Sequence, residues 1–133
     1  MSLTYQRGSE TILVVDDEDS LRTVVADLLG QLGYRILSAR NGVEALDLAR
    51  DYAGRIDVLL CDVVMEGLPG PELAEQLLRA RPELKVVFMS GFADTSLAPG
   101  GILKPGTVLI QKPFTVRALS AKLREILDQA AKP

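Results

Sequence analysis

Short apolar runs rich in β-forming residues alternate with segments of helical periodicity along this chain of 133 residues. The apolar runs lie at residues 11–15, 35–39, 57–61, 85–89 and 107–110. Between most of them, apolar residues recur every three or four positions, which is the pattern of helices with one buried face. Five strands separated by helices predict an α/β fold in which helices cover both faces of a parallel sheet. Right-handed crossovers and one chain reversal give a doubly wound sheet of order 2-1-3-4-5.

The expected helices follow from the periodicity and from residues that favour helix ends. Four helices are expected to begin near Ser20, Gly42, Pro71 and Thr115. Asp19 or Ser20 is expected to cap the first helix, and the apolar face of that helix includes Val24. In the second helix, Val43 and Leu46 share one apolar side.

Residues 93–106 interrupt this regular pattern with prolines and glycines. A doubly wound, flavodoxin-like sheet places its fourth helix between the fourth and fifth strands. Because proline and glycine break helices, we expect that helix to be short, at about 94–98, or irregular.

The chain is long enough for one domain with one hydrophobic core. We expect the domain to span residues 10–128, with short tails at 1–9 and 129–133. Residues 1–3 are either native or a cloning leader, and the sequence leaves both possibilities open.

The composition restricts the compartment and the ligands. A single cysteine excludes an intrachain disulfide and favours a cytoplasmic location. The absence of histidine excludes a histidine base and a phosphohistidine on this chain. A net charge of -3 argues against nucleic-acid binding, which usually needs a basic surface. No apolar run approaches the roughly 20 residues that span a bilayer, so no membrane partner is expected.

Polar residues follow the predicted strands at the edge where their carboxyl ends meet. Asp16 and Asp17 follow the first strand, and Asp62 follows the third. Ser90 and Lys112 follow the fourth and fifth strands. Because the first and third strands are neighbours, three carboxylates crowd together and repel one another. A hard divalent cation such as Mg²⁺ would relieve that repulsion, and a nearby ammonium and hydroxyl suit the oxygens of a phosphoryl group.

Each of these residues alone has an ordinary structural explanation. An acidic pair at a strand end is commonly a solvated loop or a helix cap, and a serine or a Lys-Pro pair there is commonly part of a turn. Cys61 is explained as a small buried hydrophobe. The functional interpretation therefore depends on joint placement, because all of the polar elements follow predicted strands on one side of one sheet.

Four stretches, in this order and at strand ends, resemble the receiver domain of two-component response regulators. They are ILVVDDE at 12–18, LLCDVVM at 59–65, VVFMSG at 86–91 and QKPF at 111–114. The resemblance covers roughly residues 10–128. The four motifs are most similar to those of the receivers of hybrid sensor histidine kinases.

The resemblance implies an acceptor and a metal site. Asp62 would be the phosphoacceptor that forms an acyl phosphate. Asp17 would bind Mg²⁺ directly, and Asp16 would act on the ion mainly through water. The backbone carbonyl of Val64 would be a further ligand.

The resemblance also implies a switch, and here the chain departs from the family pattern. Lys112 would contact a phosphoryl oxygen, and the hydroxyl of Ser90 would move toward the phosphoryl group. Many receivers carry an aromatic residue where this chain has Leu109. A leucine has no ring to swing inward, so the usual aromatic switch is in doubt.

Three further residues near the expected acceptor bear on its chemistry. Val64 and Phe92 are both apolar, and we hypothesise that they hinder the water that would hydrolyse an acyl phosphate. Glu66 stands where the family often has proline, and it is expected to be a solvated loop charge rather than a metal ligand.

The function implied is that of a phosphorelay receiver that catalyses only its own phosphorylation and dephosphorylation. A histidine kinase or phosphotransfer domain would supply the phosphoryl group from a histidine outside these residues. An origin in a hybrid histidine kinase is expected, and a stand-alone response regulator is the alternative. Because residues 93–106 interrupt a surface that receivers commonly use to dimerise, a monomer or weak dimer is expected.

The sequence fits three other functions less well. A Mg²⁺-dependent phosphohydrolase with an aspartyl-phosphate intermediate usually carries a second acid where Val64 stands. A flavin carrier needs a hydroxyl-rich phosphate loop, and the acids at 16–18 would repel a flavin phosphate. A degenerate receiver that acts only as a docking surface is disfavoured by the complete set of polar residues, although Leu109 leaves it open.

Overall fold

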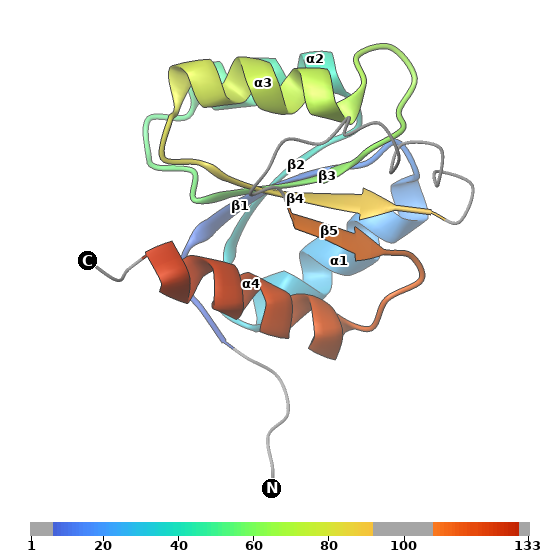
Figure 1. Cartoon of the computed structure of the whole chain (residues 1–133), viewed down its shortest axis with the longest axis vertical. Helices are drawn as coiled ribbons and strands as arrows, with labels where there is room; N and C mark the ends of the chain where they lie inside the picture. Colours follow the sequence, from blue (N-terminus) through green and yellow to red (C-terminus); the bar gives the residue numbers. More distant parts are fainter. Residues whose placement is uncertain (1–6, 92–107, 131–133) are drawn as a thin grey trace, which may run out of the picture.

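The computed structural model describes residues 7–91 and 108–130, in which a sheet lies between two layers of helices (Figure 1). The strands of this part are β1 (Thr11–Val15), β2 (Arg35–Ala39), β3 (Val58–Asp62), β4 (Lys85–Ser90) and β5 (Val108–Gln111). They pair in parallel in the order β2-β1-β3-β4-β5, which confirms the predicted doubly wound sheet. The short or irregular helix predicted at 94–98 lies outside the described residues, as does Phe92.

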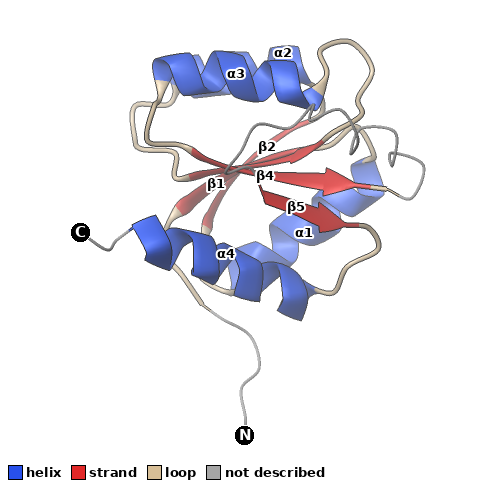
Figure 2. Cartoon of the chain, in the orientation of Figure 1, coloured by secondary structure: helices blue, strands red, loops and turns tan. Residues whose placement is uncertain are grey.

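The helices of the described residues cover both faces of the sheet, α2 and α3 on one face and α1 and α4 on the other (Figure 2). The described helices are α1 (Asp19–Gln31), α2 (Gly42–Asp51), α3 (Gly70–Ala80) and α4 (Val116–Ala130). Buried residues of α2 and α3 form one half of the core, and buried residues of α1 and α4 form the other. Within the described ranges, no helix is both long and apolar enough to cross a lipid bilayer.

Apart from Thr11 at the start of β1 and Asp62 at the end of β3, these two central strands are apolar, because both of their faces are covered. In β1, Leu13 and Val15 pack toward α2 and α3, whereas Ile12 and Val14 pack toward α1 and α4. All four side chains are completely buried. Successive side chains of a strand point to opposite faces, so a strand between two helical layers has no solvent side. The polar residues are therefore found where the strand ends.

Three strands end one residue later than predicted. β3 ends at Asp62, β4 at Ser90 and β5 at Gln111. At its start, β3 excludes Asp57, whose carboxylate accepts the backbone N–H of Thr11 at 2.9 Å. Asp62 and Ser90 are consequently the last residues of their strands, where the sheet holds their backbones.

The prediction that Val24 and Val43 belong to buried helix faces is wrong. Val24 is 51% exposed, and Val43 is 64% exposed. The buried residues of these helices are Val25 and Leu29 in α1, and Gly42, Ala45 and Ala49 in α2. Within each helix the larger buried residues are four positions apart, so a valine one or two positions away lies on a different side.

The predicted capping of α1 by Asp19 or Ser20 is also wrong. The helix begins at Asp19, and the residue before it, Glu18, makes no side-chain cap. The turn is instead closed by Asp16, whose Oδ1 accepts the backbone N–H of Glu18 at 2.8 Å. A carboxylate at the end of β1 therefore directs the chain into α1.

Gly70, at the start of α3, lies too close to the end of β3 for a larger residue. A Cβ at this position would lie 2.3 Å from the carbonyl oxygen of Asp62. We expect Gly70→Ala to lower the free energy of unfolding by about 1–3 kcal/mol, because the backbone must move to relieve the clash. Urea denaturation measures this loss. Gly30→Ala is the control, since a Cβ there meets nothing within 4 Å, and equal stability of the two variants would contradict the prediction.

Candidate functional site

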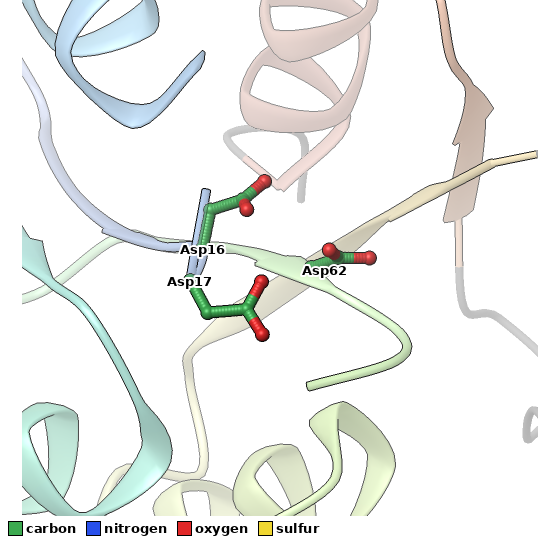
Figure 3. Close-up of side chains that lie close together, drawn as sticks. All are labelled: Asp16, Asp17 and Asp62. Atoms are coloured by element: carbon green, nitrogen blue, oxygen red, sulfur yellow. The ribbon is translucent and has the colours of Figure 1, made fainter. Parts of the chain in front are cut away.

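Four of the five strands deliver polar residues to the same edge of the sheet. Asp16 follows β1, Asp62 ends β3, Ser90 ends β4 and Lys112 follows β5. Asp17 completes the group, and Figure 3 shows the three aspartates gathered at this edge. Their carboxylates each place one oxygen within 4.8 Å of the others. The structure therefore brings together the three acids that sequence analysis predicted to crowd into one site.

Asp16 is the most deeply buried of the three acids, with no exposed surface. Its Oδ1 accepts the N–H of Glu18 at 2.8 Å, and its Oδ2 lies 3.2 Å from Nζ of Lys112. Both oxygens therefore have a partner within the protein. A buried carboxylate is stable only when it is paired in this way.

Asp17 is the exposed acid of the cluster. Its Oδ2 accepts the backbone N–H of Glu66 at 3.5 Å, which is the outer limit of a hydrogen bond. The carboxylate of Asp17 can consequently bind a ligand without breaking a strong contact. Asp17 is therefore better able than Asp16 to bind a cation directly.

Lys112 is the cation that balances the buried acids. Its Nζ lies 3.2 Å from Oδ2 of both Asp16 and Asp62. Burial disfavours the charged ammonium, but the two carboxylates outweigh this effect and raise the pKa of Lys112. The peptide bond between Lys112 and Pro113 is cis. One lysine is thus shared between two carboxylates at the end of neighbouring strands.

Asp62 lies at the centre of the edge, between Asp16 and β4. Its Oδ2 contacts Lys112, and its Oδ1 accepts the backbone N–H of Val64 at 3.4 Å. Burial raises the pKa of Asp62, Lys112 lowers it, and the charge of Asp16 raises it further; the net direction is upward. Val64, whose backbone N–H contacts this carboxylate, is 54% exposed.

Asp62→Asn is expected to stabilise the metal-free protein increasingly as the pH rises. Because the folded protein holds the proton of Asp62 more tightly than the unfolded chain, the stability that it contributes is present below a pH of about 3.8. That stability is lost as the pH rises through the raised pKa of Asp62. The amide of the Asp62→Asn variant does not titrate, so the variant loses no stability at this position. Urea denaturation in EDTA across this range measures the gain. Asp51→Asn, at an exposed acid, is the control; a gain for Asp62→Asn that does not vary with pH would contradict the prediction.

Ser90 and Leu109 are placed differently with respect to this edge. Ser90 is 7% exposed, and its hydroxyl donates to the carbonyl oxygen of Gly91 at 3.3 Å. The backbone N–H of Lys112 donates to the carbonyl of Ser90 at 2.7 Å, which ties the ends of β4 and β5 together. Leu109 is 45% exposed in the middle of β5. It therefore lies on the strand and not among the strand-end residues.

One residue of this edge, Arg22, was not found from the sequence. Its Nη1 donates to the carbonyl oxygen of Asp16 at 2.8 Å, and its Nη2 lies 2.7 Å from Oδ1 of Asp19. The only signal in the sequence was its position, four residues after Glu18. One helical turn brings a side chain at this position back toward the end of β1. Cys61, by contrast, is buried as expected, and burial raises the pKa of its thiol.

The cluster has the donor set that Mg²⁺ prefers. Mg²⁺ usually binds one or two carboxylates and keeps several waters. Asp17 is exposed enough to meet water, and Asp62 lies beside it at the strand end. Oxygen donors without sulfur or imidazole suit a hard cation. The residues present therefore fit a magnesium ion.

The fold and this edge define a class of protein, the receiver domain of two-component systems. The family model for the response regulator receiver domain matches residues 12–124. The chain belongs to this family, and this confirms the resemblance found in the sequence.

Particular relatives include both long and short proteins. The chain is 34% identical to the sensor kinase CckA of Brucella abortus over 92% of its own length, a stretch that makes up 13% of that kinase. It is 29% identical to the response regulator receiver protein CpdR of Brucella abortus, over 90% of this chain and 98% of CpdR.

Solved structures agree with these relatives. The receiver domain of the hybrid histidine kinase CckA has a TM-score of 0.74 and 34% identity, with 88% of this chain and 98% of that chain covered. A CheY-like receiver domain protein from Methanospirillum hungatei has a TM-score of 0.81 and 26% identity, with 92% and 97% covered. The chain is thus similar to a small part of a kinase and to nearly the whole of short regulators.

Proposed function

We propose that this receiver domain accepts a phosphoryl group on Asp62 in the presence of Mg²⁺. One observation carries the proposal: Asp62 belongs to the acidic cluster with Asp16 and Asp17, and the ammonium group of Lys112 lies 3.2 Å from its carboxylate. This arrangement places positive charge beside a nucleophilic carboxylate that must approach negative phosphoryl oxygens. Asp17 would hold the ion directly, with the Val64 carbonyl as a further ligand, and Asp16 would act mainly through water.

The reaction is a transfer between two nucleophiles. One oxygen of Asp62 forms a bond to phosphorus as the bond from phosphorus to a histidine nitrogen of the donor breaks. The bonding electrons return to that nitrogen, so charge and atoms balance. Mg²⁺, when bound, neutralises negative charge on the phosphoryl oxygens. Lys112 adds a second positive charge, and the strand ends fix the reacting carboxylate in place.

The switch follows from the charge that the phosphoryl group brings. Its oxygens would compete with Asp16 for Lys112, and they would accept a hydrogen bond from Ser90. Ser90 must release the carbonyl of Gly91 to make that bond. The result would be a shift between two conformational states at the end of β4. Leu109, with an exposed side chain and no ring, would couple to this shift only through its place on β5.

The donor would be the phosphohistidine of a histidine kinase or a phosphotransfer domain. Receivers of hybrid kinases have this partner in the same system, and the similarity to CckA favours a hybrid-kinase origin. The similarity to nearly all of CpdR supports the alternative, a stand-alone regulator. We place the chain in the cytoplasm, as a monomer or weak dimer that binds no nucleic acid, consistent with its single buried cysteine and its net charge of -3.

Labelling by a small phosphodonor tests the proposal. The protein is incubated with acetyl phosphate, with Mg²⁺ in one sample and EDTA in the other, and its intact mass is recorded. We expect one phosphoryl group to be gained only with Mg²⁺, and peptide mapping to locate it at Asp62. Equal labelling with EDTA would overturn the role of the metal. Turnover of a phosphomonoester would favour the phosphohydrolase, which the valine at position 64 makes the weaker candidate.

Val64→Asn is expected to shorten the lifetime of the acyl phosphate severalfold. Val64 is exposed, and its backbone N–H donates to the Asp62 carboxylate, so an apolar side chain at this position would hinder an attacking water. An amide would instead hold a water near the phosphorus. Decay of the phosphorylated protein, followed by intact mass after removal of the phosphodonor, measures the lifetime. Val43→Asn, at an exposed valine of α2, is the matched control, and an unchanged or longer lifetime in Val64→Asn would reject the prediction.

A further inference from the structure

Arg22 lies in the first turn of α1, yet only 13% of its side chain is exposed. Its guanidinium makes two contacts at once. Nη1 donates to the carbonyl oxygen of Asp16 at 2.8 Å, and Nη2 pairs with Oδ1 of Asp19 at 2.7 Å. The planar fork of arginine is suited to two such contacts, whereas lysine is a single point of charge.

The carbonyl that Arg22 holds belongs to the peptide unit between Asp16 and Asp17. The N–H of Asp16 still continues the sheet, because it donates to the carbonyl of Ala39 at 3.3 Å. β1 itself ends at Val15, so the carbonyl of Asp16 lies beyond the strand ladder. A peptide unit is planar and moves as one body. By holding the carbonyl oxygen of Asp16, Arg22 fixes the orientation of this peptide plane and therefore the position of the Asp17 Cα.

Asp17 needs such support more than its neighbours do. Asp16 is anchored by Glu18 and Lys112, and Asp62 is anchored by Lys112 and the end of β3. Asp17 is exposed, and its described side-chain contact is the 3.5 Å hydrogen bond from the N–H of Glu66. The direction of its carboxylate is therefore set mainly by the backbone.

We infer that Arg22 is a positioning residue for the metal site, which fixes the peptide between Asp16 and Asp17 and so directs the Asp17 carboxylate toward Asp62. The inference rests on the proposed function, in which Asp17 binds Mg²⁺ directly. Outer contacts that orient a metal ligand commonly change metal affinity when they are removed. Arg22 does this although its charge has the same sign as the ion.

Charge and geometry predict opposite effects, which makes the role of Arg22 testable. If Arg22 acted only through its charge, its removal would reduce repulsion and tighten Mg²⁺ binding. If it positions Asp17, its removal weakens Mg²⁺ binding. Arg22→Lys keeps the charge and loses the fork, whereas Arg22→Gln loses the charge.

Isothermal titration calorimetry of the whole chain with Mg²⁺ measures the dissociation constant of each variant. We expect Arg22→Lys and Arg22→Gln each to weaken binding by about tenfold. Arg50→Gln is the matched control, because Arg50 is an exposed arginine of α2 paired with Asp47, and it should leave the constant unchanged. Urea denaturation in EDTA reports whether each variant is folded.

The outcomes separate the explanations. An unchanged constant in Arg22→Lys, or tighter binding by Arg22→Gln, would overturn the inference. Loss of stability in EDTA without a change in the constant would show a purely structural role and would overturn it as well. The titration uses no phosphodonor, so a wild-type protein that binds Mg²⁺ but is not labelled contradicts the proposed function alone. A wild-type protein that binds no Mg²⁺ overturns the positioning role.

Discussion

Asp62→Asn abolishes the Mg²⁺-dependent gain of a phosphoryl group from acetyl phosphate, if Asp62 is the acceptor. The amide has nearly the shape of the carboxylate but lacks the nucleophilic anionic oxygen. The fold should survive, because burial and the charge of Asp16 both oppose ionisation of Asp62, and the neutral side chain avoids that cost. Intact mass spectrometry after incubation with the phosphodonor measures the loss.

The control for this variant is another acid of the same chain. Asp51→Asn replaces an exposed carboxylate at the end of α2, outside the cluster of Asp16, Asp17 and Asp62, and should be labelled like the wild type. Labelling that survives in Asp62→Asn would contradict Asp62 as the acceptor. Peptide mapping would then show whether Asp16 or Asp17, whose oxygens lie in the same cluster, carries the phosphoryl group.

The position of the site was predictable because it follows from topology. Parallel strands place all of their carboxyl ends at one edge, and the order 2-1-3-4-5 makes β1 and β3 neighbours. A polar residue after each apolar run is thus enough to predict that Asp16, Asp62 and Lys112 meet. The error of one residue in the end of β3 did not matter, because it moved Asp62 onto the strand and not to another edge.

The contacts within the site were not predictable in the same way. The sequence placed Lys112 and Ser90 at the edge but did not show that one lysine bridges Asp16 and Asp62. It also missed Arg22, because a helical residue at the surface and one that folds back onto a strand carbonyl share the same periodicity. Which atoms meet depends on rotamers and on helix rotation. The exposure of Val24 and Val43 shows that periodicity alone leaves that rotation uncertain by one or two residues.

The shared lysine has a consequence for the metal-free protein. Asp16 is completely buried, and among the described residues Lys112 is the cation paired with its carboxylate. A bound Mg²⁺ and the ammonium of Lys112 would draw on the same carboxylates. The two cations would therefore compete in the resting state, although both would be needed to neutralise a phosphoryl group.

Lys112→Met is expected to separate these two effects. Loss of one positive group that stabilises transferring charge should slow labelling by acetyl phosphate by about a hundredfold to a thousandfold. Mg²⁺ binding should tighten in the same variant, because the competing ammonium has gone from Asp16 and Asp62. The labelling rate by mass spectrometry and the Mg²⁺ dissociation constant by calorimetry measure the two effects. Lys85→Met, at the exposed amino end of β4, is the matched control. Weaker Mg²⁺ binding together with slow labelling would indicate a damaged site, and an unchanged labelling rate would exclude Lys112 from the transfer.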